Sequence, residues 1–128
     1  MISRFPKSKG TTKFNSVKTN VAGLWFASQF EALIYQQLLM QQRAGIYTHI
    51  QCQDTVHLTE AKIIYKPDFK CTRSDGTIEW VEAKGFETPE WRIKLKLWKH
   101  YGPGPLTIYK GSTSRGFTIE TVTPKPNK

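Results

Sequence analysis

The turn sequence Arg73-Ser74-Asp75-Gly76 constrains the fold of this chain more than any other feature. It separates two strand-like stretches, residues 62–71 and 77–84. Asp-Gly between such stretches is a strong hairpin signal, so the two strands should pair side by side. Pairing would bring Asp68, which follows Pro67 on the first strand, back toward Glu82 on the second.

The sequence Glu82-Ala83-Lys84 places an acid and a lysine on one face of the second strand, because side chains alternate along an extended chain. Asp68 then lies nearby. Carboxylates hold Mg²⁺, which polarises a phosphoryl oxygen and acidifies a bound water. A lysine can orient that water and offset charge in the transition state. The group is therefore suited to phosphodiester hydrolysis, with the Ala83 backbone carbonyl as a further ligand. Alternatively, these residues are ordinary strand-end charges.

The composition indicates one globular domain with a polyanionic partner. The chain has 128 residues, a formal charge of +9 and a pI near 9.7. A ribosome-like or membrane-surface protein could be equally basic. No apolar run is long enough to span a bilayer, and the basic N-terminal region lacks the apolar segment of a signal peptide. Cys52 and Cys71 fit neither a zinc site nor a disulfide framework, so a reducing cytoplasmic setting is expected.

The chain divides into three parts: a basic flexible arm at residues 1–20, a domain at 21–122 and a tail at 123–128. The arm could equally be a solubilising tail. Within the domain, Ser28-Gln29-Phe30-Glu31 has the form of a capping box and predicts a helix that ends near Ala44, before Gly45.

Further elements follow from the pattern of apolar residues and breakers. Thr88 and Pro89 predict the start of a second helix that ends near Tyr101. The strand before this helix and the one after it should form a βαβ crossover with a parallel pair. The expected fold is α/β with a mixed β-sheet, in the order helix, three strands, helix, strand. The other predicted strands span residues 47–53, about 56–58, 106–109 and 117–122.

The chain resembles the PD-(D/E)XK nuclease superfamily, and more closely its small phage-encoded, Holliday junction resolvase-like members. The resemblance covers residues 13 to about 108. It rests on Lys13-Phe14, Gly23, Phe26-Ala27-Ser28 with Glu31-Ala32, Gly45 with Gln53, Pro67-Asp68-Phe69, Glu82-Ala83-Lys84-Gly85, and Thr88 with Trp91, Lys94 and Lys96. It implies a restriction-endonuclease-like core. The chain departs from these relatives at Ala83, where Val is common, and at Asp54, where Pro is usual.

The resemblance also implies roles for individual residues. Asp68 and Glu82 become metal ligands, Lys84 the catalytic lysine, Glu31 the acid from the first helix, and Gln53 a supporting residue. Glu31 has an alternative role, because the third position of a capping box can bond the backbone of the cap residue. The sequence leaves both roles open.

The predicted second helix carries Arg92, Lys96 and Lys99 together on one side, and a further cation, Lys94, among its apolar residues. Trp91, Leu95 and Trp98 form one apolar stripe, with a second beside it at Ile93, Leu97 and Tyr101, and Lys94 falls between the two. Lys94 either extends along the tryptophans or meets DNA phosphate or the catalytic carboxylates. The predicted DNA-binding residues are Lys7, Lys9, Lys13 and Lys18 on the arm and Arg92, Lys94, Lys96 and Lys99 on the helix.

The sequence therefore predicts a Mg²⁺-dependent DNA endonuclease, with Mn²⁺ able to substitute. Resemblance to resolvases makes branched DNA the expected substrate and a homodimer the expected assembly, since symmetric cutting of two strands needs two sites. No membrane association is expected, and a phage-encoded enzyme would work in the host cytoplasm. The alternatives are a nicking or double-strand endonuclease without branch preference, a non-catalytic nucleic-acid-binding module, and a generic basic RNA-binding protein.

Overall fold

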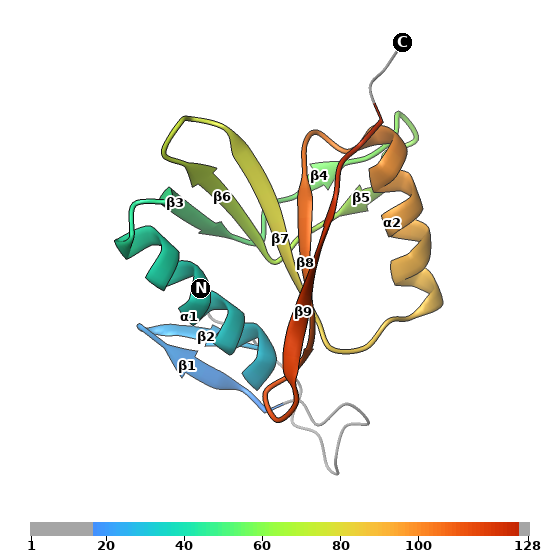
Figure 1. Cartoon of the computed structure of the whole chain (residues 1–128). Helices are drawn as coiled ribbons and strands as arrows, with labels where there is room; N and C mark the ends of the chain where they lie inside the picture. The colour runs from blue at the N-terminus through green and yellow to red at the C-terminus, as the bar shows by residue number, and fades with distance from the viewer. Residues whose placement is uncertain (1–16, 126–128) are drawn as a thin grey trace.

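In the part of the chain that the structure describes, two helices lie on opposite faces of a mixed five-stranded β-sheet (Figure 1). The computed structural model describes residues 17–125. The strands of the main sheet lie in the order β3-β6-β7-β8-β9, and two further hairpins, β1-β2 and β4-β5, stand apart from it. The elements are β1 (Thr19–Val21), β2 (Leu24–Phe26), α1 (Gln29–Arg43), β3 (Tyr47–Cys52), β4 (Val56–His57), β5 (Ile64–Tyr65), β6 (Phe69–Arg73), β7 (Ile78–Lys84), α2 (Pro89–Tyr101), β8 (Leu106–Ser112) and β9 (Gly116–Val122).

The predicted hairpin and crossover are both confirmed. Strands β6 and β7 are antiparallel, and the turn between them closes with a 2.7 Å hydrogen bond from Arg73 N to Thr77 O. Gly76 has a φ of 90°, a conformation that glycine adopts without strain. Strands β7 and β8 are parallel, as the intervening helix α2 requires, whereas the other three pairings of the sheet are antiparallel.

Both helices begin at the residues that the sequence predicts. The Ser28 hydroxyl accepts a 3.1 Å hydrogen bond from Glu31 N at the start of α1, which ends at the cap residue Ala44. Thr88 accepts from Trp91 N at 3.1 Å in the same way, so each cap satisfies a backbone N–H that has no partner within its helix.

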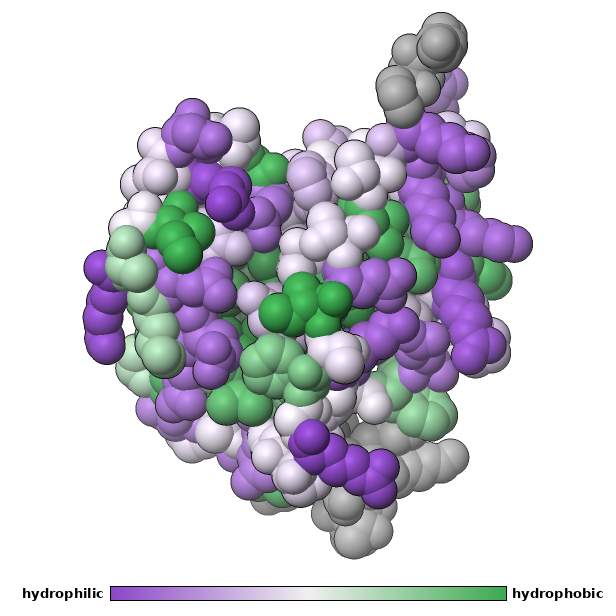
Figure 2. Space-filling view, viewed as in Figure 1, coloured by the Kyte–Doolittle hydropathy of each residue, from purple (hydrophilic) through white to green (hydrophobic). Residues whose placement is uncertain are grey.

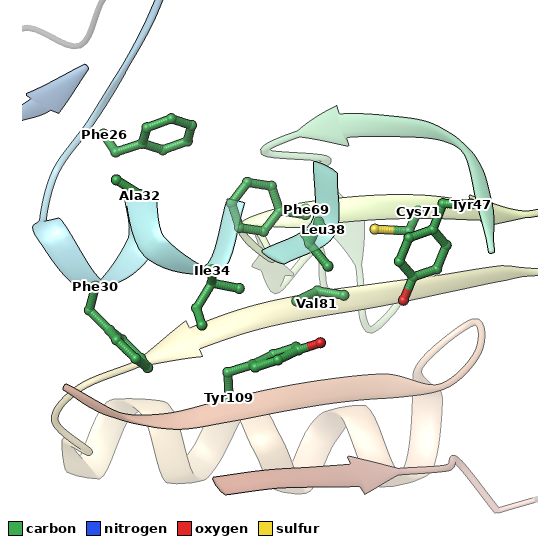
Figure 3. Packing of buried hydrophobic residues seen from close by; sticks show 10 residues of the cluster. All are labelled: Phe26, Phe30, Ala32, Ile34, Leu38, Tyr47, Phe69, Cys71, Val81 and Tyr109. Carbon is green, nitrogen blue, oxygen red and sulfur yellow. The ribbon is translucent and has the colours of Figure 1, made fainter. Parts of the chain in front are cut away.

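Each helix covers its own hydrophobic core. Figure 3 shows residues of the first core, where Ile34 and Leu38 of α1 lie beside Phe69 and Val81 of the sheet. Phe30 of α1 belongs to the same core and packs against Phe117. A second core lies on the α2 side and is rich in large aromatic residues, with Trp80, Trp91 and Trp98 at its centre. Alternation along β7 sends Val81 and Ala83 to the α1 side, so Glu82, which lies between them, faces α2.

The structure corrects the prediction of one continuous strand at residues 62–71. β5 ends at Tyr65 and pairs with β4, whereas β6 begins at Phe69 and joins the main sheet. Pro67 lies at the break, because proline has no N–H to donate to a ladder. The strand predicted at residues 47–53 ends one residue earlier, at Cys52.

The N-terminal region contains a hairpin that the sequence did not indicate. β1 starts at Thr19, inside the range predicted for the arm, and turns through Ala22 and Gly23, both with positive φ, into β2. Residues 1–16 of the predicted arm, with Lys7, Lys9 and Lys13, lie outside the described residues. Neither α1 nor α2 is long and apolar enough to cross a membrane.

Candidate active site

The candidate site lies where β6 and β7 stop pairing. Their ladder begins at the pair Phe69 and Val81, whereas β7 stays paired with β8 as far as Lys84. The edge of β7 beyond Val81 that would face β6 is therefore open. Asp68 fills this position: its Oδ2 accepts a 2.9 Å hydrogen bond from Ala83 N. Asp68 N in turn donates to Glu82 Oε1 at 3.3 Å, so the two acids meet as the hairpin register predicts.

Glu82 is buried and held by three donors. Only 6% of its surface is exposed. Its Oε1 accepts from the Tyr65 hydroxyl at 2.6 Å as well as from Asp68 N, and its Oε2 lies 3.1 Å from Lys84 Nζ. The Lys84 contact confirms that both side chains lie on one face of β7. Burial still raises the pKa of Glu82, although Lys84 and the Tyr65 hydroxyl oppose the shift.

The charge of Glu82 also acts on two neighbouring carboxyls, those of Asp68 and Glu31. Burial, followed by repulsion from Glu82 and Glu31, raises the pKa of Asp68 well above its ordinary value. Burial and the charge of Glu82 raise the pKa of Glu31 to about 7, against a lowering by Lys84. Glu31 is thus both the residue whose N–H bonds the Ser28 cap and an acid in electrostatic contact with the site.

Sequence reasoning missed two residues that hold the site in place. Tyr65 orients Glu82, and the ring of Trp91 lies under Lys84, whose Nζ is 4.4 Å from the ring centroid. Such a cation–π contact restrains the ammonium without neutralising it. The sequence did offer a signal for Trp91, because this residue belongs to an apolar stripe on the helix that follows shortly after Lys84. For Tyr65 no signal existed, since it precedes the unexpected strand break.

The donor set suits a hard divalent cation that keeps several waters. Within residues 17–125 no group of three or more His, Cys, Asp or Glu side chains gathers closely enough to hold a metal by itself. Mg²⁺ commonly uses only one or two carboxylates and completes its shell with water and substrate oxygens. Asp68 and Glu82 would supply these carboxylates. The N–H and C=O of a strand residue point to the same edge, so the Ala83 carbonyl lies on the Asp68 side of β7.

Charge balance is a second reason that a cation fits. Glu31, Asp68 and Glu82 repel one another in a buried region, and Lys84 is the cation whose charge acts on all three. Burial is the main cause that raises the pKa of each of these carboxyls, and mutual repulsion adds to it for Asp68 and Glu31, so a bound cation would offset the repulsive part.

Gln53 supports Asp68 through its backbone. Its N–H donates a 2.8 Å hydrogen bond to Asp68 O, and its side chain is exposed. This bond extends the β3-β6 contact by one residue and fixes the main chain that carries the carboxylate. Asp54, where the family resemblance breaks, accepts a 3.0 Å hydrogen bond from the Trp80 indole.

The predicted DNA-binding cations occupy different positions. Arg92, Lys96 and Lys99 are exposed on the outer surface of α2, which is hydrophilic in Figure 2. Arg92 lies 3.6 Å from Glu87. Lys94 does not point at the carboxylates: its ammonium donates a 2.8 Å hydrogen bond to Ile64 O. Lys18, also exposed, lies 6.0 Å from the Trp25 ring centroid.

Comparison with known proteins gives a single result. No curated protein and no solved structure matches the chain. One family model matches residues 11–110, and its description is a protein of unknown function, DUF1064. The match includes every residue of the candidate site and spans well over half of the sequence, so the chain belongs to the DUF1064 family.

Proposed function

We propose that this protein is a divalent-metal-dependent DNA endonuclease with a restriction-endonuclease-like core of the PD-(D/E)XK type. The observation that carries the proposal is the meeting of Asp68, Glu82 and Lys84 at the open edge of β7, with Asp68 bonded to Ala83 N at 2.9 Å and Lys84 to Glu82 at 3.1 Å. Two acids and a lysine at this spacing can hold a divalent metal and offset the charge that develops on a phosphate, which suits phosphodiester hydrolysis.

Each residue has a part that follows from its contacts. Asp68, Glu82 and the Ala83 carbonyl would hold Mg²⁺ or Mn²⁺, with Glu31 contributing directly or through a water. The bound metal would polarise a phosphoryl oxygen and lower the pKa of a water. Lys84, restrained by the Trp91 ring, presents its ammonium to the phosphate and offsets the charge that develops on it. Tyr65 keeps the Glu82 carboxylate in one orientation.

The charge distribution supports a nucleic-acid substrate. The chain has a formal charge of +9, and Arg92, Lys96 and Lys99 lie exposed on the helix whose first turn contacts Lys84. Cations in such a row can contact successive phosphates and release their counterions. Resemblance to resolvases favours branched DNA, cut by a homodimer that brings two sites to opposite strands.

The test is a cleavage panel of linear, nicked, flapped and four-way DNA, each with Mg²⁺ and with chelator. Wild type should cut only with metal and should cut the four-way junction fastest. Asp68→Asn and Glu82→Gln should lose cleavage and retain DNA binding, because each removes ligand charge with little change in volume. Lys84→Ala should also be inactive and still bind metal.

Glu120→Gln is the matched control, since Glu120 is an exposed acid on β9 that pairs with Lys110 at 3.2 Å. It should cut like wild type. Metal-dependent cleavage by either carboxylate variant at the wild-type rate would overturn the site. DNA binding without cleavage of any substrate would instead favour the non-catalytic module, and equal cutting of linear and branched DNA by a monomer would overturn the resolvase assignment alone.

A further inference from the structure

A cleft opens beside the candidate site, between α2 and the segment that leads into β5. Its volume is about 480 Å³, within the range of pockets that hold small organic ligands. The residues that line it include Ile63, Tyr65, Lys84, Trp91, Ile93 and Lys94. Tyr65 and Lys84 also contact Glu82, at 2.6 and 3.1 Å, so one wall of the cleft is shared with the site.

The walls of the cleft combine apolar surface with positive charge. Ile63 and Ile93 are 40% and 57% exposed, which leaves two branched apolar side chains open to an occupant at the rim. Lys84 and Lys94 supply cations, opposed by the one acid of the lining, Glu90. Lys94 uses one of its three ammonium protons on Ile64 O, which fixes the charge in place.

Trp91 adds an independent observation. Its side chain is 4% exposed, and its indole Nε1–H is the only buried side-chain polar atom in residues 17–125 without a hydrogen-bond partner. An unpaired buried donor is costly, and in a native structure each such group calls for an explanation, of which a bound water or ion is one. The apolar walls and the cations of the cleft together match a group that is flat and apolar in one part and anionic in another.

We propose that this cleft receives an unpaired nucleotide adjacent to the cleaved phosphodiester, with the base against Ile63 and Ile93 and the phosphate toward Lys84 and Lys94. The inference rests on the proposed nuclease function and specifies its substrate. A base within continuous duplex is stacked on both faces and paired along its edge, so it cannot enter a side cleft. The protein therefore selects DNA in which a nucleotide beside the cut is unpaired or can be extruded.

Equilibrium binding in chelator tests the cleft without any cleavage. The probes are a fluorescein-labelled eight-nucleotide thymidine strand and the same strand made of abasic units, which keeps every phosphate and removes every base. Wild type should bind the thymidine strand about tenfold more tightly, which is near the low end of what a base stacked on an aromatic side chain contributes, because the walls here are aliphatic. Equal affinity for the two probes would overturn the inference with the wild-type protein alone.

Variants then locate the base contact. Ile63→Ala combined with Ile93→Ala should reduce the preference below about threefold, because both apolar walls are lost. Ile119→Ala is the matched control: Ile119 is 57% exposed, like Ile93, but lies on β9. It should keep the full preference. A double variant with an unchanged melting temperature and the full preference would overturn the placement of the base.

Cleavage separates this inference from the proposed function. If no DNA is cut with Mg²⁺ but the thymidine preference depends on Ile63 and Ile93, the nuclease proposal fails and the nucleotide cleft stands. If DNA is cut and abasic and thymidine strands bind alike, the nuclease stands and the cleft is overturned.

Discussion

Replacing Glu31 by glutamine should stabilise the metal-free protein at pH 8 and leave its stability near pH 4.5 unchanged. Burial and the charge of Glu82 raise the pKa of Glu31 from 4.5 to about 7. Between these two values the folded chain binds more protons than the unfolded chain, so the free energy of unfolding of the wild type falls as the pH rises through this window. Glutamine does not ionise and avoids that loss.

The magnitude follows from the two pKa values. At about 1.36 kcal/mol for each pKa unit, ionised Glu31 costs the folded protein roughly 3 kcal/mol at pH 8. For a chain of this size such a difference corresponds to an increase of about 10 °C in the melting temperature of the variant. As the pH falls through 4.5, the Glu31 carboxyl becomes protonated in the unfolded chain as well as in the folded chain, and the advantage of the variant disappears.

Thermal unfolding in chelator, at pH 8 and at pH 4.5, measures the effect. Glu60→Gln is the control, because Glu60 is exposed in the loop after β4 and should show no change at either pH. Added Mg²⁺ should stabilise the wild type more than the variant, since a cation that binds the folded chain also relieves the repulsion. A variant that melts no higher than wild type at pH 8, or equally higher at both pH values, would refute the electrostatic reasoning.

Three further predictions concern the site and the DNA surface. Tyr65→Phe removes the 2.6 Å hydrogen bond to Glu82 and should lower the free energy of unfolding in urea by about 1–3 kcal/mol and slow cleavage; wild-type values of both would exclude an orienting role for Tyr65. Replacing Arg92, Lys96 and Lys99 together by glutamine should reduce the slope of log affinity against log salt by up to about 3, and an unchanged slope would place DNA elsewhere. Calcium should support DNA binding with little turnover, so efficient cutting in Ca²⁺ alone would contradict a Mg²⁺ mechanism.

Much of the fold could be predicted because its signals are local. A hairpin turn with Gly76, a cap at Ser28 and the Thr88-Pro89 start of α2 each depend on a few adjacent residues. The parallel pairing of β7 with β8 then follows from the helix between them. The hairpin β1-β2 could not be predicted, since strands of three residues are too short to show alternation.

In the candidate site, too, the features that depend on local sequence could be predicted and those that depend on packing could not. The approach of Asp68 to Glu82 and the shared face of Glu82 and Lys84 follow from strand register, which sequence reveals. The roles of Tyr65 and Trp91 depend on how the β4-β5 hairpin and α2 pack against the sheet. Packing of that kind joins residues far apart in the chain, and no local pattern reports it.

Pro67 explains why the acids can meet at all. Had β6 paired with β7 beyond Phe69 and Val81, the N–H of Ala83 would have been bonded to a strand and Asp68 excluded from that edge. Proline ends the ladder because it has no N–H, and the freed backbone donor is taken up by the Asp68 carboxylate at 2.9 Å. The same break leaves the Ala83 carbonyl without a partner from β6. A strand interruption thus produces both the paired acids and the backbone oxygen that the proposed metal site needs.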